Sequence, residues 1–140
     1  MPSCSSRSVP TKTYPFLVLG AGEMPRPYLL IRASSPTPGK TVDALALIDT
    51  GADECSFPVE LAAQLGHTID KGKPKTVLTG AGPTTVYSHS ASISFDGFTV
   101  ADAIIDFNPR LRIPLLGVKS FLSNFVLTVD YPAKTFSLSY

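Results

Sequence analysis

The sequence predicts a mainly β fold that closes on itself as a single domain, with one or two short helices. The length of 140 residues suits one domain, and a hydrophobic content of 44% is enough to close one core without disulfides or a metal. From Tyr14 onward, short apolar runs alternate with clusters of Gly, Pro and polar residues, as strands alternate with turns. Thirteen prolines also limit long helices, because each lacks a backbone N–H and clashes with the preceding turn.

The strand patterns fall into separate segments along the chain. Three apolar runs come first: YPFLVLG (14–20), PYLLIRAS (27–34) and VDALALID (42–49). The segment KPKTVLTGAGPTTVYSHSASISF (73–95) alternates on both sides of a glycine-rich turn and predicts a β-hairpin. Further strands are expected in FTVADAIIDF (98–107) and in NFVLTVDYPAKTFSLSY (124–140), where Asp130-Tyr131-Pro132-Ala133 forms a turn.

Two short helices and a tail complete the predicted organisation. Helices are expected in VELAAQLG (59–66), between a proline and a glycine, and in VKSFLSNF (118–125). Residues 1–13 are rich in Ser, Pro and Thr and nearly empty of large apolar side chains, so ordering them would cost entropy with little burial in return. We therefore expect a flexible tail over 1–13 and one folded domain over 14–140.

Charge and composition exclude several classes of function. Twelve basic and eleven acidic side chains leave a formal charge of +1, which predicts neither nucleic-acid nor membrane binding. Cys4 and Cys55 lack the spacing of a disulfide framework or a zinc site, so no metal or other cofactor is expected. The chain shows no secretory signal and no run of about 20 apolar residues that could span a bilayer. These features favour a soluble, cytoplasmic protein.

The segment LALIDTGADECSF (45–57) carries the chemistry of the chain. An apolar strand breaks at Asp49, where a carboxylate among apolar residues is costly to desolvate unless it is used. Thr50 supplies a hydroxyl, and Gly51 permits close approach of the backbone. Taken alone, Asp-Thr-Gly is better explained as a turn in which Asp49 accepts backbone N–H groups.

The order of three further features changes that interpretation. After the acid come the hairpin TVLTGAGPTTV (76–86), the apolar run IPLLG (113–117) and the short helix VKSFLSNF. This arrangement resembles the retropepsin family, the single-domain aspartic peptidases of retroviruses, retroelements and some cellular proteins. The resemblance extends over roughly residues 26–140 and is strongest over 45–53, 77–85 and 113–121.

The resemblance implies an acid-protease barrel with a mobile flap, and a role for each residue of the motif. The family's pattern of two hydrophobic residues, Asp, Thr or Ser, Gly and Ala is matched from Leu47 to Ala52. This match implies that Asp49 is catalytic and that Thr50 and Gly51 complete the catalytic loop. Thr50 would form a hydrogen bond across a dimer axis. Ala52 and Asp53 would contact the substrate.

The hairpin would be the flap that closes over a bound peptide. Gly80, Ala81 and Gly82 would form its tip, and Ile113 and Leu115 would line side-chain pockets. Many retroviral members have Arg and Asn after the glycine of the IPLLG-like run, and that Arg pairs with the acid equivalent to Asp53. Here Val118 and Lys119 stand there, so Asp53 needs another partner and the dimer interface can differ.

The chemistry of peptide hydrolysis requires two such chains. Water attack needs a base to take a proton and an acid to give one, and one carboxyl cannot start in both states. Two facing carboxyls share a proton and offer both. Because the chain has a single Asp-Thr-Gly, an active enzyme must be a homodimer that binds its polypeptide substrate as an extended strand. We expect the strand TFSLSY (135–140) to be an unpaired edge that pairs with its symmetry mate, joined by segment 14–20.

Other functions fit the sequence less well. A non-catalytic dimeric peptide-binding module with the same fold is the main alternative, and the intact Asp-Thr-Gly-Ala argues against it. An aspartyl-phosphate enzyme would need an Asp-x-Asp spacing for magnesium, whereas Thr50 and Gly51 follow Asp49. Asp43, Asp53 and Glu54 have no metal-ligand spacing with Asp49.

Three further features are given ordinary structural interpretations. His67 and His89 are expected to lie far apart on the surface, and Cys55 is expected to be a small buried apolar residue rather than a redox-sensitive thiol. The bond Tyr14–Pro15 could be a site of self-cleavage, although a linker that ends at a strand explains it more simply.

Overall fold

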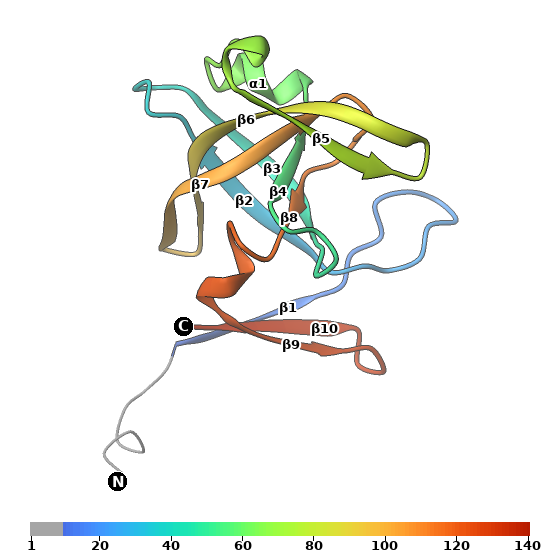
Figure 1. Ribbon diagram of the computed structural model, residues 1–140. Coiled ribbons are helices and arrows are strands. Elements are labelled where there is room, and N and C mark those ends of the chain that lie inside the picture. The colour runs from blue at the N-terminus through green and yellow to red at the C-terminus, as the bar shows by residue number, and fades with distance from the viewer. Residues whose placement is uncertain (1–9) are drawn as a thin grey trace, which may run out of the picture.

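The computed structural model describes residues 10–140, which form ten strands, one α-helix and two 3₁₀ helices (Figure 1). The elements in chain order are β1 (Thr11–Pro15), β2 (Tyr28–Ser34), β3 (Thr41–Ile48), β4 (Cys55–Pro58), α1 (Glu60–Gln64), η2 (Ile69–Lys71), β5 (Lys73–Thr79), β6 (Gly82–Phe95), β7 (Phe98–Asn108), β8 (Leu115–Leu116), η3 (Leu122–Asn124), β9 (Val126–Asp130) and β10 (Thr135–Ser139). Within these residues no helix is long and apolar enough to cross a membrane.

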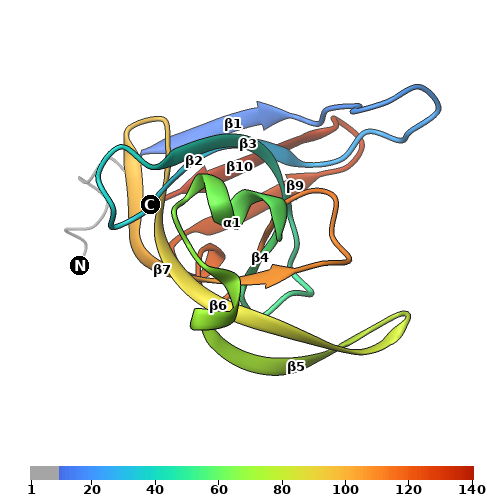
Figure 2. The same ribbon diagram turned by 90° about the horizontal axis from the view of Figure 1, so that it is seen from above.

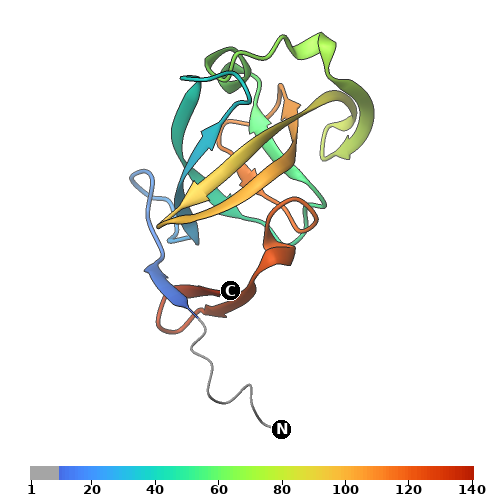
Figure 3. The same cartoon turned by 90° about the vertical axis from the view of Figure 1, so that its left-hand side faces the viewer.

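Seven strands form a sheet that closes into a barrel. Their order is β2-β3-β8-β4-β7-β6-β5, and an additional pairing between β2 and β6 joins the two sides of the sheet. Figure 3 shows this closure from the side, with β5 and the first part of β6 extending beyond it. The predicted mainly β, closed, single-domain fold is confirmed.

The barrel closes because its strands alternate apolar and polar side chains. In β2, Leu29, Ile31 and Ala33 point into the core, whereas Leu30 and Arg32 face outward. The core also holds fully buried aromatic rings, and each large apolar side chain taken from water contributes about 1.5–3 kcal/mol. The predicted helix over 59–66 is present as α1, at the end of the barrel opposite β9 and β10 (Figures 1 and 3).

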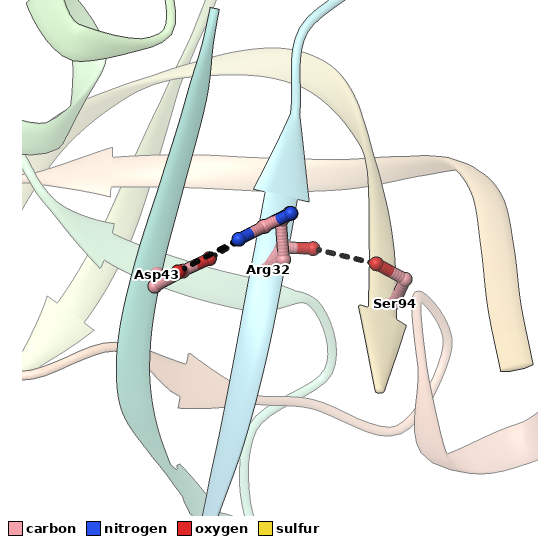
Figure 4. Close-up of polar contacts among 3 residues, drawn as sticks. All are labelled: Arg32, Asp43 and Ser94. Atoms are coloured by element: carbon pink, nitrogen blue, oxygen red, sulfur yellow. Dashed lines mark hydrogen bonds and ion pairs between the residues drawn. The ribbon is translucent and has the colours of Figure 1, made fainter. Parts of the chain in front are cut away.

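An exposed ion pair crosses the outer face of β2 and β3 (Figure 4). The Arg32 guanidinium donates to both carboxylate oxygens of Asp43, at 2.7 and 3.0 Å, and lowers the pKa of that carboxyl. The Ser94 hydroxyl donates to the carbonyl oxygen of Arg32 at 3.4 Å. Such surface pairs contribute little to stability, and Asp43 is engaged here rather than with Asp49.

Strands β1, β10 and β9 form a second sheet, the terminal sheet, below the barrel in Figure 1. β10 lies in the middle and pairs with both neighbours. The expectation that 135–140 forms an unpaired edge is therefore wrong, and the outer strands of this sheet are β1 and β9. β1 begins at Thr11, so residues 11–13 belong to a strand rather than to the expected tail. Residues 1–9 of that tail lie outside the described part of the chain.

The segment expected as a strand over 14–20 leaves the sheet after Pro15. The N–H of Phe16 still donates to Lys134 and Leu17 pairs with Arg26, but the residues between form a loop. Gly22 has a φ of +79°, a conformation that glycine adopts without strain. The Tyr14–Pro15 bond lies inside β1, paired with β10, and the Tyr14 hydroxyl donates to Asp96. The bond therefore belongs to a paired strand rather than to a linker that ends at a strand, and self-cleavage there stays a prediction.

The second expected helix is shorter than the sequence suggests. Only Leu122–Asn124 is helical, and the N–H groups of Leu122 and Ser123 donate to carbonyls five residues back. This wider turn places Phe121 and Phe125 against Phe95, with ring centroids 5.7 and 5.5 Å apart. Aromatic burial therefore outweighs regular helix geometry here.

Candidate active site

Asp49 lies at the end of β3, in a loop that leads to β4. Its N–H donates to the carbonyl oxygen of Leu116 in β8 at 3.1 Å, which fixes the loop to the strand beside it. Its Oδ1 accepts the N–H of Gly51 at 2.9 Å, and the N–H of Ala52 donates to its carbonyl oxygen at 3.2 Å. The acid is thus held by backbone groups rather than by a cation.

Gly117 and the residues after it support the loop from behind. The N–H of Val118 donates to Ala52 at 2.8 Å, and the N–H of Lys119 donates to the carbonyl oxygen of Asp53 at 2.6 Å. A Cβ on Gly117 would lie 2.2 Å from the carbonyl oxygen of Glu54, so only glycine fits. The glycine that ends the run Ile-Pro-Leu-Leu-Gly is therefore part of the support of the Asp49 loop. Among residues 10–140, the carboxylate of Asp53 forms no ion pair.

Ser120 is a supporting residue that sequence reasoning missed. Its side chain is buried, donates to the Glu54 carboxylate and accepts the N–H of Cys55 at 3.1 Å. It joins the end of the Asp49 loop to the segment after Gly117. The only signal in the sequence is a small polar residue within a mostly apolar stretch, which does not identify its partner.

A cleft of about 650 Å³ begins at the Asp49 loop and extends beneath the β5–β6 hairpin. Of the residues predicted from the sequence, those that line it are Asp49, Gly51, Ala52, Asp53 and Leu115. Its other walls are formed by Glu54, Ser56, Lys75, Thr76, Val77, Leu78, Thr79, Val86, Asp106, Asn108 and Leu111. Thr50 is exposed beside the cleft, and Ile113 is half-buried; neither is part of its wall in the single chain.

The β5–β6 hairpin projects beyond the barrel (Figure 2). At its tip the Thr79 hydroxyl donates to the carbonyl oxygen of Gly82 at 2.7 Å and accepts the N–H of Ala81 at 3.2 Å. Gly82 has a φ of +102°, and Gly80 completes the turn. Leu78, next to the tip, is 86% exposed, an unusual position for a leucine unless another surface covers it. The predicted hairpin is present, with glycines at the turn.

Asp106 is a buried acid in the cleft wall that the sequence reading did not single out. It lies on β7, accepts the Ser88 hydroxyl at 2.7 Å and pairs with the Lys75 ammonium at 2.9 Å. Because Lys75 and Ser88 belong to the two strands of the hairpin, Asp106 anchors the base of the hairpin to the barrel. An acid in the apolar run AIIDF was the available signal.

The two histidines lie together, contrary to the expectation that they are far apart. Their rings stack with centroids 4.4 Å apart, and both are half-buried. The Nε2 of His67 is 3.1 Å from the carbonyl oxygen of Ser90, and that of His89 is 3.0 Å from the carbonyl oxygen of Ile69. The register of β6 and the turn at η2 bring the two histidines together. The spacing of the histidines in the sequence predicts neither the register nor the turn.

Stability is expected to fall with acidity through His67. Burial and the neighbouring His89 lower the pKa of His67 below its ordinary value of 6.5. As the pH falls, the unfolded chain therefore binds this proton before the folded chain does. The stability that neutral His67 contributes is complete above pH 6.5 and is lost as the pH falls through the lower pKa of the folded state. Urea unfolding at a series of pH values should show a steeper loss for wild type than for His67→Gln. If the free energy of unfolding changed with pH in the same way in both proteins, this effect of His67 would be contradicted.

Cys55 is expected to be inert in the folded protein. It is fully buried, and burial raises the pKa of its thiol to about 11, so the reactive thiolate is scarce at neutral pH. In a Cys4→Ser variant, iodoacetamide should leave Cys55 unmodified in native buffer and label it completely in denaturant, as read by mass spectrometry. Labelling at the same rate in both conditions would show that the thiol is accessible.

Comparison with known proteins agrees with this architecture. The aspartyl protease family model matches residues 38–120, more than half of the chain. A retropepsin-like aspartic protease from Rickettsia conorii has a similar solved structure, with a TM-score of 0.68 and 21% sequence identity over 96% of each chain. No curated protein matches the chain. The resemblance drawn from the motifs is confirmed: the chain belongs to the aspartyl protease family and has the retropepsin-like fold.

Proposed function

We propose that the protein is an aspartic endopeptidase that acts as a homodimer and hydrolyses peptide bonds with water held between two Asp49 carboxylates. The observation that carries this proposal is the placement of Asp49 in a cleft of about 650 Å³ beneath a glycine-tipped hairpin. Membership of the aspartyl protease family supports the same chemistry.

The reaction needs both carboxyls in one site. When two Asp49 side chains face each other, repulsion between like charges keeps one protonated at mildly acidic pH. The ionised carboxylate takes a proton from water as the water attacks, and the protonated one donates to the carbonyl oxygen. Thr50 is exposed next to Asp49, where its hydroxyl can brace the paired loops.

Exposed apolar side chains near the Asp49 loop, beside the hairpin tip and in the loop after β1 support a partner surface. Val118 follows the supporting glycine, Leu78 lies beside the tip, and Val18, Leu19 and Met24 project from the loop after β1. Large apolar side chains gathered near a functional loop are typical of an interface. A two-fold axis beside Asp49 would bury them against their copies.

The terminal sheet can extend this interface through β9. The edge strand β1 carries Lys12 and ends at Pro15, and such residues discourage pairing at an edge. β9 carries Val126, which is 67% exposed, and its other edge is already paired with β10. We therefore place the edge-to-edge contact at β9 rather than at β10.

The substrate would bind as an extended strand between the hairpin and the Asp49 loop. Ala52 and the tip residues Gly80, Ala81 and Gly82 would contact its backbone, while Asp53 would contact it from the floor. Apolar residues of the cleft would receive its side chains, among them Leu115, Val77, Val86 and Leu111 from the wall and Ile113 from its border. Closing of the hairpin would exclude water from the reacting bond.

Digestion of an unbiased peptide library tests this function. The protein is first shown to be dimeric by sedimentation, then incubated with the library at mildly acidic and at neutral pH, and the products are read by mass spectrometry. Cleavage between apolar residues is expected, fastest at mildly acidic pH. If a verified dimer cuts nothing, the peptidase proposal fails and a peptide-binding module with this fold becomes the better description.

A further inference from the structure

A second pocket lies at the base of the hairpin, beside the catalytic cleft. It has a volume of about 580 Å³, and its charged or ring-bearing walls are formed by three lysines, two histidines and one acid: Lys71, Lys73, Lys75, His67, His89 and Glu54. We propose that this basic pocket binds an acidic side chain of the peptide substrate, at a fixed distance along the strand from the bond that is cut. The proposal rests on the peptidase function proposed above and assigns part of its specificity.

The basic pocket adjoins the catalytic cleft. Glu54 and Lys75 line both. A strand bound in the cleft advances about 3.3 Å per residue, and alternate side chains point the same way. A peptide that leaves the cleft past Glu54 would therefore present one side chain to the basic pocket, a few residues away from the scissile bond.

The charges of the basic pocket are not balanced within the chain. Lys75 is paired with Asp106, at 2.9 Å. Among residues 10–140, Lys71 and Lys73 form no ion pair, and both are exposed at the rim. The nearest acid of the lining, Glu54, accepts the buried Ser120 hydroxyl and is thereby held on the side of the Asp49 loop. Two ammonium groups are thus left to attract a carboxylate or phosphate group.

The histidine pair gives the basic pocket a fixed wall. Carbonyl oxygens can only accept, so the Nε2 atoms bonded to Ser90 and Ile69 carry hydrogen, and in the neutral rings Nδ1 is the site that takes up a proton. Gly72 lets the chain approach this wall, since a Cβ there would lie 2.5 Å from His89 Nε2. The pocket is therefore formed before any ligand binds.

Cleavage profiling with a charge-neutralised variant tests the pocket. Wild type should cut peptides with Glu at one fixed position about three- to tenfold faster than the matched Gln peptides, as expected for a partly exposed ion pair with two lysines. Lys71→Gln/Lys73→Gln should remove this preference without lowering cleavage of the Gln peptides. The control Lys40→Gln/Lys134→Gln loses two exposed lysines elsewhere and should keep it.

Phosphoserine at the same position separates the two sources of negative charge. Faster cleavage of the phosphoserine peptide than of the Glu peptide assigns the basic pocket to phosphorylated substrates, and slower cleavage assigns it to carboxylates. Either result supports the shared chemistry. A wild type without any acidic preference, or a preference that survives Lys71→Gln/Lys73→Gln, would overturn the proposal.

A binding measurement separates failure of the pocket from failure of the peptidase. If no peptide is cut, the ring protons of His67 are followed by NMR while inorganic phosphate, a Glu-containing hexapeptide and its Gln counterpart are added. Saturable shifts with phosphate and the Glu peptide, absent with the Gln peptide and in Lys71→Gln/Lys73→Gln, would keep the basic pocket as an anion site. Equal responses to all three ligands, or none, would reject it.

Discussion

Replacing Asp49 with Asn is expected to abolish peptide cleavage and to leave the fold and the dimer unchanged. The amide has nearly the shape of the carboxyl, and its oxygen can still accept the N–H of Gly51, now found at 2.9 Å from Oδ1. It cannot share a proton with a second copy, so both general acid and general base are lost. The rate should fall by at least about a thousandfold. Initial rates on the best peptide of the library measure this loss.

Asp43→Asn is the matched control for that substitution. Asp43 is on β3, six residues before Asp49, but it is exposed and pairs with Arg32 on the outer face. Its loss should leave the rate near that of wild type. If Asp49→Asn cleaved the peptide about as fast as wild type, with unchanged circular dichroism and sedimentation, Asp49 would have no role in the mechanism.

Gly117→Ala is expected to be among the most destabilising single substitutions in the chain. The added methyl would lie 2.2 Å from the carbonyl oxygen of Glu54 and 2.9 Å from that of Ala52. These are backbone atoms and cannot rotate away, so the Asp49 loop must move. The free energy of unfolding should fall by about 3 kcal/mol or more. Urea unfolding followed by circular dichroism gives the value.

Gly80→Ala provides the comparison for that effect. Nothing lies within 4 Å of the Cβ that this change would add at the hairpin tip. Its effect on the free energy of unfolding should stay within about 0.5 kcal/mol, as for other exposed sites. Equal stability of the Gly117→Ala and Gly80→Ala proteins would contradict the close approach described at Gly117.

The barrel and the catalytic loop were predictable because their signals are local. Alternation in β2 and the glycine-rich turn of the hairpin can each be read from a few neighbouring residues. The acid at the end of β3 and the glycine of the IPLLG run follow a fixed order in the sequence, and the structure places both beside the same loop. Local pattern and family resemblance together were enough for these parts.

The features that sequence reasoning missed depend on contacts between distant residues. The position of β10 between two partners follows from the pairing of β1 with the end of the chain, which alternation within 135–140 cannot reveal. The stacked histidines are 22 positions apart and meet only through the turn at η2. The contact of Asp106 with Lys75 likewise requires the register of β6 and β7. The sequence pattern therefore predicts which segments form strands, but it does not predict which strands pair.

The most direct test of the central claim is a mixing experiment with wild type and Asp49→Asn. The two proteins are unfolded together in varied proportions at constant total concentration, refolded, and assayed on one peptide. If each active site needs an Asp49 from both chains, activity will follow the square of the wild-type fraction, because mixed dimers are inactive. Activity in direct proportion to the wild-type fraction would show that one chain suffices and would contradict the shared site.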